Sequence, residues 1–219
     1  MRTGVRAMQA DGVHRPAQVL LYWLPLGAGG RFVRMNGRVY EAVLARRAGR
    51  PAQDLYHSAL EVFVDGHGYV IEMAPVWSEG GRDHGAVGEG PVGSVLLGRS
   101  ALFRYEVRRW HGGVIPDVDE AVDSPRVASR DPATAREVLA LVPAFPRLVW
   151  GRDEHGAGDM WNSNSLVSWL LARSGHDMAP LGPPRHGRAP GWQAGLLAAR
   201  APGPAGRPVV TERPGVRGR

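Results

Sequence analysis

Two short segments of the chain hold polar residues whose types suit nucleophilic chemistry. The first is residues 56–62, in which His57 stands at the head of a β-prone run. The second is residues 159–167, in which an Asn-Ser-Asn-Ser run over 162–165 precedes apolar residues. A histidine can act as the general base for a serine hydroxyl when the two groups come within hydrogen-bond reach. The two segments are therefore candidates for one nucleophilic site.

The second segment is expected at the N-terminus of a helix. The unpaired N–H groups and the dipole at such an end favour a developing negative charge, as an activated nucleophile or an oxyanion requires. Each segment also has a purely structural explanation. A histidine at a strand start is commonly satisfied by the backbone, and Asn-Ser-Asn-Ser is a good capping sequence.

The composition excludes several other chemistries. All 27 basic residues are arginine, so a P-loop lysine, a Schiff base and a Ser/Lys dyad are absent from the chain. It has no cysteine, which excludes disulfides, thiolate zinc sites, iron–sulfur clusters and cysteine nucleophiles. The 30 glycines and 18 prolines, with arginine in place of lysine, indicate GC-rich coding of a bacterial kind.

The elements that must position the candidate residues follow from hydrophobic periodicity and from turn residues. Strands are predicted at 19–24, 57–64, 69–74 and 102–107, the second and third forming a β-hairpin. Helices are predicted at 38–47, from Asp131-Pro132 through Leu141, and at 163–173 with Gly175 as the terminal residue. The glycine-rich stretch 78–99 is predicted to be a loop. Strands and helices are segregated, so the fold class is α+β.

The hairpin also predicts a register. A tight turn at Gly66-His67 places Glu72 opposite Glu61. His57 then lies four residues farther along its strand, roughly 13 Å away.

Two further motifs are present in the chain. Residues 88–93 fit the dinucleotide glycine pattern, but they lie in a predicted loop and are followed by too few residues for a crossover helix. The histidines lack zinc-hydrolase spacing, and Asp153-Glu154-His155 is better explained as a solvated loop than as an ion site. No cofactor and no metal are therefore expected.

The positive charge is concentrated at the C-terminal end. Residues 180–219 hold seven arginines and one acid, Glu212, which equals the whole formal net charge of +6. Their high Pro and Gly content predicts a flexible tail, which at most makes weak contacts with anionic surfaces. We expect no specific nucleic-acid binding, no signal peptide, no membrane span and a cytoplasmic location.

The two segments, in this order, resemble the permuted papain-like superfamily, which includes NlpC-type amidases, the lecithin:retinol acyltransferase group and PPPDE isopeptidases. Residues 57–62 are similar to the histidine strand of that superfamily. Residues 69–75 are similar to the acyltransferase strand that carries a second histidine, with Glu72 in its place. Residues 162–166 are similar to the nucleophile motif, with Ser163 in the position of the cysteine. The resemblance spans roughly residues 18–175.

The resemblance implies a papain-like α+β domain over residues 18–178, between a flexible segment 1–17 and a tail 179–219. It implies an acyl-transfer hydrolase or transferase acting on a peptide, amide, isopeptide, ester or lipid-like substrate. Ser163 would be the nucleophile, His57 the base, the Ser163 N–H part of the oxyanion hole, and Glu72 or Asn162 the orienting group. The alternative is a catalytically inactive papain-like domain that serves as a binding or interaction module.

Overall fold

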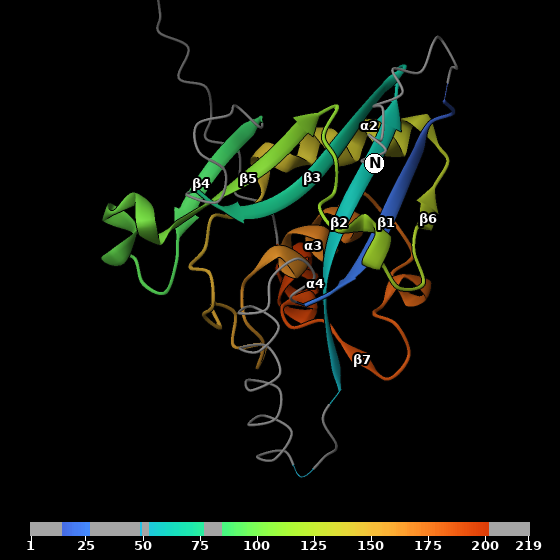
Figure 1. The fold of residues 1–219 in the computed structure, drawn as a ribbon. Helices are drawn as coiled ribbons and strands as arrows, with labels where there is room; N and C mark the ends of the chain where they lie inside the picture. The colour runs from blue at the N-terminus through green and yellow to red at the C-terminus, as the bar shows by residue number, and fades with distance from the viewer. Residues whose placement is uncertain (1–14, 27–48, 50–52, 77–84, 202–219) are drawn as a thin grey trace, which may run out of the picture.

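The computed structural model describes residues 15–26, 49, 53–76 and 85–201. The helix predicted at 38–47 and most of the N-terminal segment 1–17 lie outside these residues. The described part of the chain is a mixed α+β structure, built on one sheet and three α-helices (Figure 1). The predicted α+β class is therefore confirmed.

Six strands form a continuous antiparallel path. They are β1 (Gln18–Pro25), β2 (Asp54–Val64), β3 (His67–Pro75), β4 (Ala86–Pro91), β5 (Arg104–His111) and β6 (Arg126–Ser129). Their order across the sheet is β4-β5-β3-β2-β1-β6, and a short β7 (Gly187–Arg188) pairs with β2 in parallel. Three strands therefore form near their predicted positions, because their alternating apolar residues suit a sheet with one face packed on helices.

The hairpin between β2 and β3 corrects the predicted register. Val64 pairs with His67, so the turn consists of Asp65 and Gly66, both with positive φ (53° and 79°). Asp-Gly is a preferred two-residue hairpin turn because both residues tolerate this backbone conformation. Glu61 consequently pairs with Val70 and not with Glu72.

Two predictions about β4 and β5, at the edge of the sheet opposite β6, are wrong. Residues 86–91 form β4, although this stretch was expected to be a loop. Gly90 makes this possible, because a side chain there would collide with the ring of Tyr105 on β5. The strand predicted at 102–107 begins only at Arg104, since Leu102 and Phe103 belong to a 3₁₀ turn.

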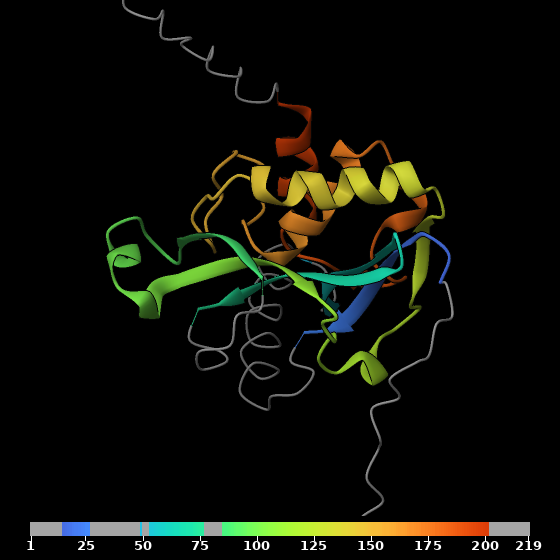
Figure 2. The same ribbon diagram turned by 90° about the horizontal axis from the view of Figure 1, so that it is seen from above.

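The three α-helices are α2 (Pro132–Leu141), α3 (Ser163–Arg173) and α4 (Trp192–Arg200). They lie on one face of the sheet (Figure 2). Short 3₁₀ turns occur at Leu97–Arg99, Ala101–Phe103, Val118–Glu120, Val142–Ala144 and Ala179–Leu181. Both α2 and α3 have the predicted bounds, and Asp131 caps α2 by accepting a hydrogen bond from Thr134 N at 2.8 Å.

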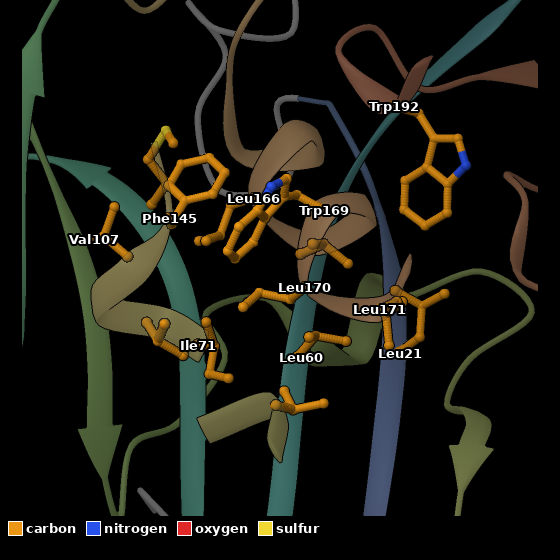
Figure 3. Close-up of a cluster of buried hydrophobic side chains, with 14 of the residues drawn as sticks. Leu21, Leu60, Ile71, Val107, Phe145, Leu166, Trp169, Leu170, Leu171 and Trp192 are labelled. Carbon is orange, nitrogen blue, oxygen red and sulfur yellow. The ribbon is translucent and has the colours of Figure 1, made fainter. Parts of the chain in front are cut away.

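The main core fills the space between the sheet and the helices. Figure 3 shows side chains of the sheet facing those of α3 there, among them Leu21, Leu60, Ile71, Leu170 and Leu171. The opposite face of the sheet has a smaller apolar cluster of Leu20, Tyr22, Leu24, Ala59, Phe63, Val70 and Ile115. Since side chains alternate along a strand, the odd-numbered positions of β2, including His57, belong to this second face.

The predicted flexible tail from residue 179 is wrong for residues 179–200, which form a 3₁₀ turn, β7 and α4. Trp192 is buried and its ring centroid lies 4.9 Å from that of Trp23 on β1. A side chain at Gly195 would collide with Ser165 and Ser168, so this glycine lets α4 cross close to α3. A composition rich in Pro and Gly does not reveal this contact, because it depends on small residues of α3. Residues 202–219 lie outside the described part of the chain.

Candidate active site

The N-terminus of α3 is fixed by a reciprocal cap. Asn162 has an extended backbone, and its Oδ1 accepts a hydrogen bond from Asn164 N at 2.9 Å. In return, Asn162 N donates to Ser165 Oγ at 3.1 Å. This is the capping-box arrangement, which satisfies N–H groups that a helix end leaves unpaired. The sequence therefore begins the helix at Ser163 for local reasons.

Asn164 ties this helix end to the sheet. Its side chain is buried, and its Oδ1 accepts a hydrogen bond from Ser58 Oγ at 2.8 Å. Its Nδ2 donates to Tyr56 O at 3.0 Å and to Pro190 O at 2.7 Å. One amide thus joins α3 to β2 and to the segment before α4, which sets the position of Ser163 relative to β2.

Of the four residues in the Asn-Ser-Asn-Ser run, Ser163 is the one whose side chain forms no hydrogen bond within the described part of the chain. Neither its hydroxyl nor its backbone N–H forms a hydrogen bond with any described residue. The side chain is half-buried and lines a cavity of about 200 Å³. A hydroxyl and an unpaired N–H at a helix N-terminus are therefore both available at one cavity wall.

The cavity lies where β3 leaves β2. Pairing between these strands ends at Leu60 and Ile71, while β3 continues along β5 to Pro75, and Figure 1 shows β3 curving away from β2. The lining residues come from both strands, β1, the 115–117 segment and α3. They are Leu24, His57, Ser58, Ala59, Glu72, Met73, Ile115, Pro116, Asp117 and Ser163.

His57, Glu72 and Ser163, far apart in the sequence, thus line one cavity. No hydrogen bond joins His57 to Ser163, and the His57 ring bonds to no other residue in the described part of the chain. Burial lowers the pKa of His57 to about 4, and the nearby carboxylate of Asp117 opposes this shift. His57 is accordingly neutral at pH 7, the form that accepts a proton.

Glu72 is held by an ion pair on the neighbouring strand. Its carboxylate lies 3.1 Å from Nη1 of Arg108, its cross-strand partner on β5. Arg108 is itself buried and also pairs with Glu106, whose Oε1 accepts a hydrogen bond from Arg108 Nε at 2.6 Å. The partly exposed Glu72 carboxylate therefore shares one buried guanidinium group with Glu106.

Asn162 has a different place from the one predicted. It does not line the cavity, and its side chain is occupied by the helix cap and by a 2.8 Å hydrogen bond to Pro190 O. The cap competes with an orienting role because the single Asn162 oxygen already accepts from Asn164 N. Three of the four candidate residues line one cavity, although His57 lies on the sheet face opposite the helices, and Asn162 lies outside this lining.

Sequence reasoning missed Asp117 and the structural role of Asn164. Asp117 lines the cavity and has a positive φ of 55°. Its signal in the sequence was weak, since Pro-Asp after a strand is common in turns. Asn164 belongs to the Asn-Ser-Asn-Ser run, but only the folded chain shows that its partners lie on β2 and before α4.

The chain matches no family model, no curated protein and no solved structure among those compared. Within the described residues, no group of three or more His, Asp or Glu side chains could hold a metal ion. The same residues include no helix long and apolar enough to cross a membrane.

Proposed function

We propose that this domain is an acyl-transfer hydrolase or transferase of permuted papain-like architecture, acting on an amide, isopeptide or ester. The observation that supports it is the shared cavity of His57 and Ser163, with Ser163 as the first residue of α3. The lack of a hydrogen bond between the two side chains is compatible with this, because catalytic hydrogen bonds often form only with substrate bound.

In the proposed reaction, neutral His57 takes the proton of the Ser163 hydroxyl as its oxygen attacks the carbonyl carbon of the substrate. The carbonyl oxygen becomes an oxyanion and accepts a hydrogen bond from the free N–H of Ser163. The C–N or C–O bond then breaks, and the leaving group takes the proton from His57. Water, or an acceptor amine or alcohol, attacks the acyl-Ser163 ester by the same steps and releases the enzyme.

The two carboxylates at the cavity wall have distinct parts in this scheme. Asp117 favours the protonated ring of His57, since its charge raises the pKa that burial lowers. Glu72 is bound to Arg108 and is assigned to positioning of the cavity wall and not to proton transfer.

A fluorophosphonate probe tests the proposal directly. We expect it to label the full chain, Ser163→Ala to remove the label, and His57→Gln to slow labelling by at least about a hundredfold. Ser100→Ala is the matched control, because Ser100 is exposed and does not line the cavity. Labelling that persists in Ser163→Ala would place the reactive serine elsewhere.

Replacing the hydroxyl by a thiol gives a second measurement. Ser163→Cys should yield a thiol that iodoacetamide modifies rapidly at neutral pH, since the helix N-terminus favours the thiolate. His57→Ala in that background should slow the reaction. Ser165 and Ser168 are buried and would make poor controls, so the comparison thiol is Ser100→Cys.

A second candidate function is supported by the low pKa of His57. A base with a pKa of about 4 is weaker than general bases that work near neutral pH, which favours a catalytically inactive domain whose cavity binds a ligand. An unlabelled wild-type chain, with an unreactive thiol in Ser163→Cys, would select this function over acyl transfer.

A further inference from the structure

The connection between β4 and β5 carries an apolar surface that the cavity does not explain. We define residues 94–103 as the finger. Its exposed apolar side chains are Val95, Leu96, Leu97, Leu102 and Phe103, with Val95 69% and Leu96 73% exposed. Large apolar side chains exposed singly are normal, but a contiguous group of them marks an interaction surface.

Part of the finger backbone is hydrogen-bonded within the finger. Gly98 N, Ser100 N and Phe103 N donate to carbonyl oxygens within the finger, at 3.2, 3.0 and 3.0 Å. Gly98 also packs against Pro91, since a Cβ at this position would lie 2.5 Å from the Cβ of that proline. The finger therefore offers apolar side chains on a firm turn rather than a free strand edge.

The charge on the finger is positive. Residues 91–104 contain no acidic side chain and two arginines. Arg104, at the base, pairs with Glu89 at 3.2 Å. Arg99 is exposed and forms no ion pair within the described part of the chain. One cation thus stands unpaired among the exposed apolar side chains.

The shape of the finger indicates which kind of partner it could contact. In Figures 1 and 2 the finger projects beyond the rest of the sheet as a convex tip. A second copy could receive such a tip in an apolar groove. Two cavities of the described residues are not grooves of this kind, because they are lined by charged groups, Asp159 and Arg188 beside α4 in one and Glu72 and Asp117 in the other.

We propose that the finger inserts into the interfacial layer of a membrane that contains anionic lipids. Leu96 and its apolar neighbours would enter the boundary between headgroups and acyl chains, with Arg99 at the lipid phosphates. The N–H groups of Gly98, Ser100 and Phe103 already have partners within the finger, so these three groups would not be left unpaired in an apolar medium. The proposal does not depend on catalysis at Ser163.

Co-sedimentation of the full chain with vesicles tests it. We use vesicles of phosphatidylcholine alone and vesicles with about one third phosphatidylserine. Leu96→Asp should weaken binding to both by at least about tenfold. Val114→Asp is the matched control. It makes the same change of charge at a side chain 67% exposed, and residue 114 follows the other end of β5 from the finger.

Arg99→Gln separates the charge from the apolar surface. It should lower the preference for anionic vesicles by about fivefold and leave binding to phosphatidylcholine unchanged. The proposal is overturned if the wild-type chain binds neither vesicle, or if Leu96→Asp and Val114→Asp bind equally. It is also overturned if the chain self-associates without lipid and Leu96→Asp abolishes that association, because the finger then contacts a second copy.

Discussion

The N-termini of α3 and α4 are tied together, yet their hydrogen-bond donors are used differently. Ser165 Oγ donates to Gly191 O at 2.8 Å, which links the two helix starts. At α4 the carboxylate of Asp159 accepts hydrogen bonds from Gly191 N and Gln193 N, at 2.6 and 3.1 Å. At α3 the cap is a neutral asparagine, and Ser163 keeps a free N–H beside the cavity.

This difference separates a structural helix end from a candidate catalytic one. A helix N-terminus attracts negative charge, and at α4 an internal carboxylate already supplies it. At α3 no carboxylate of the described residues accepts a hydrogen bond from the first N–H groups, and the first helical residue carries a hydroxyl that shares its cavity with His57. The attraction of a helix N-terminus for negative charge therefore stabilises the fold at α4, whereas at α3 it remains available to a substrate.

The largest expected effect comes from breaking the junction that places α3. Asn164→Ala removes the buried acceptor of the Ser58 hydroxyl and the Asn164 donor to Tyr56 O, while Pro190 O keeps its hydrogen bond from Asn162 Nδ2. We expect the free energy of unfolding to fall by about 3 kcal/mol, measured by urea denaturation. Ser163→Ala, one residue earlier, should change it by less than about 0.5 kcal/mol. Equal losses of unfolding free energy in the two variants would contradict a structural role for Asn164 that Ser163 does not share.

A smaller effect is expected from the pH dependence that His57 confers. Its pKa is about 4 in the folded chain and about 6.5 when unfolded, so the unfolded state binds the proton more tightly. Stability is therefore unaffected above pH 6.5 and falls as the pH drops from about 6.5 to about 4. The loss at pH 5 should be about 2 kcal/mol.

His57→Gln tests this sign, because glutamine has no charge to acquire. The difference in unfolding free energy between pH 7 and pH 5 should be about 2 kcal/mol smaller in the variant than in the wild type. His155→Gln is the control, as His155 is exposed and does not line the cavity. An unchanged pH dependence would mean that His57 is solvated and not buried.

The smallest effect concerns the carboxylate at α4. Asp159→Ala removes the acceptor for Gly191 N and Gln193 N, and we expect a loss of about 1–2 kcal/mol. Thermal unfolding measures it, with Glu154→Ala, an exposed residue of the same loop, as a control close to zero. A loss no larger than that of Glu154→Ala would show that α4 does not need this charge.

Local signals predicted several elements well. The bounds of α2 and α3 follow from the Asp131 and Asn162 caps, and the strand before Pro25 follows from its apolar run. The register of the hairpin was predicted wrongly, although Asp65-Gly66 carried the signal for it. The turn residues there fix the register more strongly than the placement of the alternating apolar residues.

The candidate site was predictable only in part. The sequence singled out His57, Glu72 and Ser163, and all three belong to the lining of one cavity, while their roles stay a prediction. The sequence did not identify Asp117. It also assigned Asn162 an orienting role, whereas the Asn162 side chain caps α3. Residues that act through local backbone bonds and residues that act in a cavity have the same types, so spacing alone does not separate them.

The sequence by itself determined where helices start, which faces of the strands are apolar, and which chemistries the absence of lysine and cysteine excludes. These depend on interactions between residues a few positions apart or on residue type alone. Only the tertiary structure decided that β3 leaves β2 beside Ser163 and that residues 192–200 form a helix against α3. Both depend on contacts between segments far apart in the chain, such as Asn164 with Tyr56 and Gly195 with Ser168, which local periodicity does not encode.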